Sequence, residues 1–236
     1  MANQKLNISP QVYARIGGVL YLFIILAGIF GELIVRGKLI VEGNATATAQ
    51  NISAANLLFR AGLVGDLLMH VCDVPLIVIF YVLLRPVSKV LALLATFFNL
   101  VQTSVLAANK LTLLAVLVFL GDSGYLKAFE ERQLHALAFA SLSLHEYGFG
   151  VGLIFFGFRC LVVGYLIYRS EYFPKTLGVL QVIVGLSYLT NSFALFLAPA
   201  LADKLFPGVL LPAFIGEVAM CFWLILKGVN LQKWPQ

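Results

Sequence analysis

The sequence predicts an all-α polytopic membrane protein, folded as a single bundle of six transmembrane helices. Of its 236 residues, 61% are hydrophobic and only 11% are charged, whereas about 25% of the residues in a typical soluble domain are charged. Apolar stretches of about 20 residues, the length that crosses a bilayer core, recur along the chain. No linker is long enough to separate domains, so residues 1–236 are expected to form one transmembrane domain.

The first two spans have clear boundaries. Ser9-Pro10 supplies a cap followed by a proline in the first helical turn, and Arg36-Gly37-Lys38 closes the first apolar segment. Residues 39–56 show little helical periodicity and are predicted to form a polar loop. The second span is predicted to stop at Arg85-Pro86, because proline ends a helix.

The other four spans follow from similar signals. The third would be about 48 Å long at 1.5 Å per residue, so it must tilt, protrude or bend in a core of about 30 Å. Gly121 to Gly124 forms a break, and Glu130 and Glu131 suit the first turn of the next helix because the helix dipole favours acids there. The short link 199–208 makes the last two spans antiparallel neighbours. The predicted spans are residues 16–35, 57–84, 89–120, 133–168, 175–198 and 209–226.

Charge and cysteine usage argue against nucleic-acid binding and against a disulfide framework. The sixteen Lys and Arg residues give a net charge of +5 but occur singly, without a basic stripe. Cys72, Cys160 and Cys221 lie in apolar segments and form no Cys-x-x-Cys pair. The first apolar run has no small-residue cleavage site after it, so the first span is expected to be retained and not removed as a signal peptide.

Basic residues recur at one end of the predicted spans. Arg15, Lys89 and Lys175 begin the odd spans, and each precedes a small residue by three positions. This pattern allows three parallel helix-pair repeats, although aromatic belts and snorkelling bases produce it without a repeat. Eight bases fall on this side and six on the other, which favours both termini in the cytoplasm. The eight are Lys5, Arg15, Arg85, Lys89, Arg169, Lys175, Lys227 and Lys233.

Ionisable side chains inside the spans are candidates for a functional site, because they are costly in a bilayer. Counting about 1.5 Å per residue from the repeated bases places Arg159, Glu217 and Asp73 near the midplane. Arg159 is expected to form an ion pair with Glu217 or Asp73, because an unpaired guanidinium there costs about 2.5 to 3.5 kcal/mol. Asn99 and Gln102 lie at the same depth as supporting polar groups.

A second polar group is predicted in the outer half of the membrane. By the same count, its members lie roughly 22 to 28 Å from the repeated bases. They are Glu32, Asp66, His70 and Asn191. Lys110, His145 and Glu146 lie further out, where side chains can reach the interface. The distribution predicts a polar cavity that opens outward, acidic in its upper part, with Arg159 at its base.

Asp66, His70 and Asp73 are spaced four and three residues apart, which places them on one helix face. A carboxylate on either side of an imidazole can set its tautomer, pass protons or bind a cation. Pro75 is expected to kink the helix beside them and free a backbone carbonyl. Together with Glu32 and Glu217, these residues form the predicted site for a ligand, a proton or a cation.

The same polar residues allow other interpretations. If a metal binds, its ligands would be Asp66, His70 and Asp73, and mostly carboxylate ligands suit a hard cation better than zinc. Haem ligation by His70 and His145 is less favoured, because their depths differ by more than about 10 Å. No cofactor is predicted, although a bound cation is allowed. In a purely structural interpretation, one acid clamps Arg159 while Asp66 and His70 are hydrated.

Several segments resemble a bacterial family of multi-pass membrane proteins, the domain of unknown function 4386. The resemblance covers nearly the whole chain and implies a protein of the prokaryotic cytoplasmic membrane. It implies no activity, ligand or catalytic residue. The segments are residues 15–21 (RIGGVLY), 84–87 (LRPV), 157–161 (GFRCL), 164–167 (GYLI), 174–180 (PKTLGVL) and 212–217 (PAFIGE).

Three functions follow as hypotheses. The leading one is binding, or proton- or cation-coupled movement, of a small solute or a lipid headgroup through the outward-opening cavity. The second is a membrane-embedded, metal-dependent hydrolase or oxidoreductase. The third is a structural or accessory subunit whose charges only hold helices together. The expected partners are therefore the lipid bilayer and a small solute or lipid, and no oligomeric state is predicted.

Overall fold

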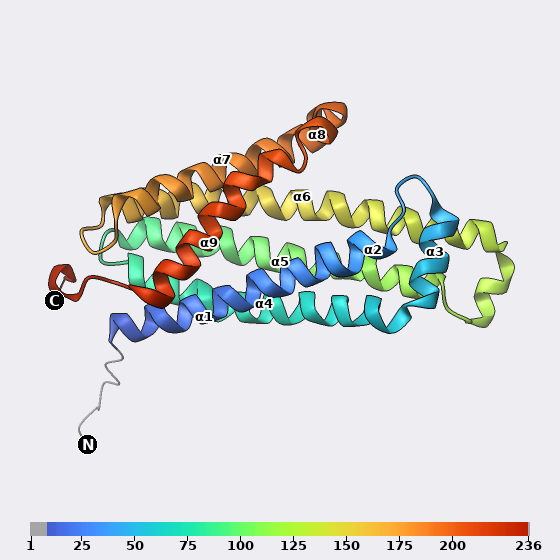
Figure 1. The fold of residues 1–236 in the computed structure, drawn as a ribbon, viewed down its shortest axis with the longest axis horizontal. Helices are drawn as coiled ribbons and strands as arrows, with labels where there is room; N and C mark the ends of the chain where they lie inside the picture. The colour runs from blue at the N-terminus through green and yellow to red at the C-terminus, as the bar shows by residue number, and fades with distance from the viewer. Residues whose placement is uncertain (1–8, 236) are drawn as a thin grey trace, which may run out of the picture.

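The computed structural model describes residues 9–235 and shows an elongated bundle of helices (Figure 1). Within these residues, six helices are long and apolar enough to cross a membrane, which confirms the predicted fold class. The first is continuous from Pro10 to Leu39 and comprises α1 (Pro10–Ile29), a π-helical segment η1 (Phe30–Arg36) and α2 (Gly37–Leu39). The others are α4 (Asn56–Leu84), α5 (Lys89–Phe119), α6 (Glu131–Arg169), α7 (Lys175–Leu197) and α9 (Leu211–Leu226).

The long helices pack as a closed ring. Each contacts the next long helix in the sequence, and α9 contacts α1. The amide of Gln11 closes the ring at one end, donating to the carbonyl of Lys227 at 2.8 Å and accepting from the backbone of Val229 at 3.0 Å. Because α1 begins where α9 ends, we call this the terminal end of the bundle. The opposite end carries α3 (Ala45–Ala54) and is called the distal end (Figure 1).

Four details differ from the sequence prediction. The expected polar loop over residues 39–56 contains α3, whose N-cap Asn44 accepts a hydrogen bond from the backbone of Ala47 and whose Ile52 is buried. The link 199–208 contains the short helix α8 (Pro199–Leu205). The first helix continues to Leu39. The last helix begins at Leu211, after a short 3-10 turn (Gly208–Leu210). Lys5, one of the eight counted bases, lies outside the described residues.

Two apolar cores occupy the two ends of the bundle. The terminal core includes Leu83, Leu166 and Leu224, all fully buried. The distal core includes Val35, Ile52 and Leu113. Buried polar side chains between these cores form a polar layer. Of the predicted site residues, this layer contains Asp66, His70, Asn99, Gln102, Arg159 and Glu217. Beyond it, α5 and α6 extend past α8 at the distal end (Figure 1).

Candidate functional site

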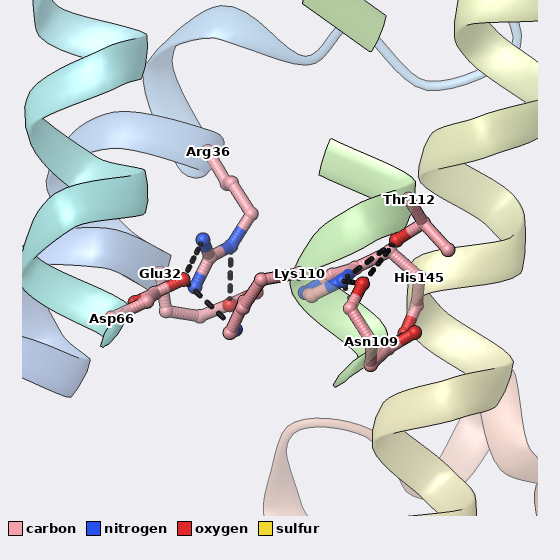
Figure 2. A network of polar contacts seen from close by, with 7 residues as sticks. All are labelled: Glu32, Arg36, Asp66, Asn109, Lys110, Thr112 and His145. Atoms are coloured by element: carbon pink, nitrogen blue, oxygen red, sulfur yellow. Dashed lines mark hydrogen bonds and ion pairs between the residues drawn. The ribbon is translucent and has the colours of Figure 1, made fainter. Parts of the chain in front are cut away.

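Two bases converge on one buried carboxylate at the distal side of the polar layer (Figure 2). Oδ2 of Asp66, on α4, accepts from Nη1 of Arg36 at 2.7 Å and from Nζ of Lys110, on α5, at 2.9 Å. The Asp66 and Lys110 side chains are only 1% and 4% exposed. The three buried groups therefore carry a net formal charge of +1 when both bases are protonated. We call Glu32, Arg36, Asp66 and Lys110 the distal ionic network.

Glu32 completes the distal ionic network from its exposed rim. Its carboxylate accepts from Nε of Arg36 at 2.9 Å, and its side chain is 64% exposed. Both residues belong to the π-helical segment η1, and π-helical turns often occur at functional sites. The neighbouring Gly31 is required for this arrangement, because a Cβ there would lie 3.1 Å from Nη2 of Arg36 and would collide with Oδ1 of Asp66.

His70 is buried one turn from Asp66, but no carboxylate bonds to it. Its Nε2 has no hydrogen-bond partner within residues 9–235, and Oδ1 of Asp66 has none either. The carboxylate of Asp66 is engaged by bases from other helices. A hydrogen-bonded series through Asp66, His70 and Asp73 is therefore not formed. The role of Arg36 was not predicted, because its position in the sequence indicated only a base that closes the first span.

Asp73 lies one turn further toward the terminal end and is half-buried. Its Oδ2 accepts from Nδ2 of Asn99 at 3.1 Å and from the hydroxyl of Thr103, both on α5. Nδ2 of Asn99 also donates to Oε1 of Gln102 at 2.9 Å. Helix α4 continues through Pro75, whose ring is exposed on the outside of the bundle. Pro75 thus lies within a continuous helix with its side chain exposed, and the kink expected there stays a prediction.

Arg159 is buried in the C-terminal half of α6 and does not form the ion pair predicted for it. Among residues 9–235, no carboxylate lies within ion-pair distance of its guanidinium. The guanidinium carbon lies 4.5 Å from the ring centroid of Phe80 and 5.2 Å from that of Phe156. Nη1 also donates to Oε1 of Gln181 at 3.5 Å. Two aromatic faces and an amide, none of them visible as partners in the sequence, therefore replace the expected acid.

Glu217 lies in the same buried region on α9. Its Oε2 accepts a hydrogen bond from the hydroxyl of Tyr21 on α1, whereas its Oε1 has no partner among the described residues. The charge of Arg159 still acts on Glu217 electrostatically, although the two side chains form no direct pair. Asn191, the remaining predicted polar residue, is half-buried on α7 and makes no side-chain hydrogen bond within residues 9–235.

A further polar junction joins α5 and α6 beside Lys110 (Figure 2). Nδ2 of Asn109 lies 3.1 Å from Nδ1 of His145 and 2.8 Å from the carbonyl of the same residue. The hydroxyl of Thr112 lies 3.2 Å from the same ring nitrogen. Gly148 leaves the space that Asn109 occupies, since a Cβ there would overlap the amide. Glu146, which was predicted at this depth, is exposed.

Two hollows in the described structure differ from the predicted outward-opening acidic cavity. A hollow of about 520 Å³ lies at the distal end, between Ala45 and the stretch of α6 from Ala136 to Tyr147, and its walls are almost entirely apolar. A second, of about 10 Å³, lies beside Arg159 and Asn99. The second is about the size of one water molecule. Neither hollow is lined by a residue of the distal ionic network.

The possible metal ligands do not assemble. Within residues 9–235, no three His, Cys, Asp or Glu side chains form a group that could hold a metal ion. Asp66, His70 and Asp73 lie on successive turns of α4. The carboxylate of Asp66 accepts a hydrogen bond from Arg36, whereas that of Asp73 accepts one from Asn99. The set predicted from their spacing is therefore not a metal-binding group in this structure.

The six spans and the polar layer define an integral, multi-pass membrane protein with buried charges in its interior. The chain belongs to the family described as Domain of unknown function (DUF4386), which matches residues 16–228. It is also similar to an uncharacterized protein from the archaeon Archaeoglobus fulgidus, with 30% identity over 172 residues, covering 72% of this chain and 86% of that protein. No solved structure matches the chain.

Proposed function

We propose that this membrane protein binds a small polar solute or a lipid headgroup from the outer side of the membrane, and that binding is coupled to proton or cation uptake in its interior. The observation that carries the proposal is the incomplete neutralisation of the polar layer. Arg36 and Lys110 share the one buried carboxylate of Asp66, the other acid on Arg36 is the exposed Glu32, and Arg159 has no acid in direct contact among the described residues. Such groups can exchange a partner for a ligand or a proton.

A purely structural role fits the polar layer less well. Buried polar atoms in folded proteins are nearly always hydrogen-bonded, because an unpaired buried donor or acceptor costs about 1 to 3 kcal/mol. Three buried atoms along the layer have no hydrogen-bond partner within residues 9–235: Oδ1 of Asp66, Nε2 of His70 and Oε1 of Glu217. Charges that only clamp helices together would gain stability if these atoms were paired. Their lack of partners favours a role in which a proton, a water or a ligand occupies them at some stage.

Glu217 is the proposed proton-binding group. Its surroundings hold one permanent positive charge and several groups that titrate, contributed by four other helices and by its own helix. They are Tyr21 on α1, Asp73 on α4, Arg159 and Cys160 on α6, Tyr188 on α7 and Cys221 on α9. If Glu217 binds or releases a proton beside the fixed charge of Arg159, the net charge at the middle of the membrane changes by one.

The test compares thermal unfolding of the purified protein between about pH 5 and 8 with that of Glu217→Gln. The wild type is expected to change its stability with pH, and Glu217→Gln is expected to lose most of that change. Glu171→Gln is the matched control, because Glu171 is exposed in the turn between α6 and α7. A wild type without pH dependence would overturn the coupling, as would a pH dependence that survives in Glu217→Gln, Asp73→Asn and His70→Gln alike.

The family and the archaeal relative support placing the protein in a prokaryotic cytoplasmic membrane. The larger number of bases at the terminal end supports cytoplasmic placement of that end. The distal ionic network would then lie on the outer side, where a solute or headgroup from outside reaches it first.

A further inference from the structure

We infer that Arg36 and Lys110 form a binding site for a phosphate group, in which the phosphate takes the place of Glu32 on the guanidinium of Arg36. This inference rests on the proposed function and names the chemical class of its ligand. The phosphate belongs either to a phospholipid headgroup or to free inorganic phosphate, and the experiment below distinguishes these sources.

The two bases of the distal ionic network carry more N–H groups than its carboxylates engage. A guanidinium carries five N–H groups and an ammonium carries three. Glu32 and Asp66 accept only three hydrogen bonds from these two bases. Once Glu32 is displaced, Arg36, Asp66 and Lys110 carry a net formal charge of +1, and the unused N–H groups of the two bases suit an anion with several acceptor oxygens, such as phosphate.

Glu32 is the partner that an incoming anion can replace. Its side chain is 64% exposed and meets Arg36 at the rim, whereas the side chain of Asp66 is 1% exposed. An exposed ion pair contributes little to stability, whereas separating a buried one leaves an unpaired charge in a low dielectric. A phosphate would therefore displace Glu32 and leave the contacts of Asp66 in place.

The depth of the network matches the level of lipid headgroups. At about 1.5 Å per residue, Arg36 and Lys110 lie about 30 Å from Arg15 and Lys89, which is the thickness of a bilayer core. Leu33 and Ile34, next to Glu32 on the same π-helical segment, are exposed apolar side chains that suit contact with lipid. A phospholipid beside η1 would bring its phosphate to the rim that Glu32 now occupies.

The experiment measures the thermal stability of the detergent-purified full chain as each of three probes is added. The probes are a short-chain phosphatidylglycerol, the matching diacylglycerol without phosphate, and sodium phosphate. The variants are Glu32→Gln, which removes the competing carboxylate, and Arg36→Gln, which removes the guanidinium. Glu42→Gln and Arg60→Gln are matched controls, because both residues are exposed near the distal end and lie outside the network.

Stabilisation by phosphatidylglycerol but not by diacylglycerol is expected, with half-saturation about two- to five-fold lower in Glu32→Gln than in the wild type. Stabilisation by sodium phosphate as well would support the site and identify free phosphate as a sufficient ligand. The inference is overturned if neither phosphate compound stabilises the protein, or if Glu32→Gln binds no tighter than Glu42→Gln. Arg36→Gln should lose the stabilisation by phosphate compounds, whereas Arg60→Gln should keep it. If Arg36→Gln does not fold, the comparison of Glu32→Gln with Glu42→Gln still tests the inference.

The two proposals fail separately. If phosphate compounds do not stabilise the wild type but its stability depends on pH through Glu217, only this inference is overturned. A phosphate response in a protein without any pH dependence would keep this site and overturn the proposed coupling.

Discussion

Nζ of Lys110 lies 2.9 Å from Oδ2 of Asp66, the same oxygen that accepts a hydrogen bond from Arg36. This ion pair connects α4 to α5, and Arg36 connects both helices to the π-helical segment η1 of the first span. A single carboxylate therefore holds three helices together where the polar layer meets the distal core.

The first prediction concerns this shared carboxylate. Asp66→Asn should destabilise the protein by about 3 to 5 kcal/mol, because it leaves the buried Lys110 without a counter-charge and leaves Arg36 with only the exposed Glu32. Glu32→Gln should cost less than about 1 kcal/mol, because that ion pair is exposed. Unfolding of both variants in the same detergent checks the difference. Equal, small losses would show that Asp66 is not the main counter-charge of Arg36 and Lys110.

The second prediction concerns how Arg159 is held. Arg159→Lys should lower stability by about 1 to 2 kcal/mol, because a compact ammonium lacks the planar face that packs on Phe80 and Phe156. Phe80→Leu should weaken the same packing, so the losses should be less than additive in the double variant. Thermal unfolding of Arg159→Lys, Phe80→Leu and the double variant measures these losses. An Arg159→Lys variant as stable as the wild type would mean that only the charge matters.

The third prediction concerns the close approach of α6 and α7. A Cβ on Gly178 would lie 2.7 Å from the carbonyl oxygen of Gly164, which is a backbone atom and cannot rotate away. Gly178→Ala should therefore push the helices apart and cost about 1 to 3 kcal/mol. Gly124→Ala is the control, because nothing lies within 4 Å of a Cβ there. If both variants unfold at the wild-type temperature, α6 and α7 do not approach this closely.

The fourth prediction concerns Tyr172, in the turn between α6 and α7. Its hydroxyl donates to the carbonyl of Leu83 at 2.7 Å, and burial raises the pKa of its phenol. Tyr172→Phe should cost about 0.5 to 1.5 kcal/mol at pH 7, the net value of a hydrogen bond. Because the folded pKa is raised, the contribution is complete below the ordinary value of about 10 and declines above it.

The check for Tyr172 is a pair of unfolding series across alkaline pH. The difference between wild type and Tyr172→Phe should be constant near neutral pH and should shrink above about pH 10. A difference that grows with pH would mean that the folded protein stabilises the ionised phenolate.

The fifth prediction concerns orientation in the membrane. Single cysteines at Glu42 and Ser123, at the distal end, should react with an impermeant thiol reagent added to intact cells, whereas a cysteine at Glu171 should react only after the cells are opened. All three positions are exposed, whereas Ser170, a neighbouring choice, is buried. The background lacks Cys72, Cys160 and Cys221. Labelling at position 171 alone in intact cells would reverse the proposed topology.

The number and approximate limits of the spans could be predicted because they depend on local features of the chain. An apolar stretch of sufficient length ended by Arg85-Pro86 or by the Gly121–Gly124 break needs no knowledge of distant residues. Helix α3 was missed for a tertiary reason: its short, weakly periodic sequence is ordered by an N-cap at Asn44 and by packing on α6. A helix of this length gains most of its stability from such contacts.

The sequence by itself determined which helices carry the polar side chains and their order along each helix, since a helix advances about 1.5 Å per residue. Asp66, His70, Arg159 and Glu217 are indeed buried. Only the tertiary structure decided their partners. Asp66 meets Arg36 and Lys110, Glu217 meets Tyr21, and Arg159 meets aromatic rings where an acid was expected. Depth is set along one helix, whereas a contact also depends on the rotation and separation of two helices, which the packing of the whole bundle determines.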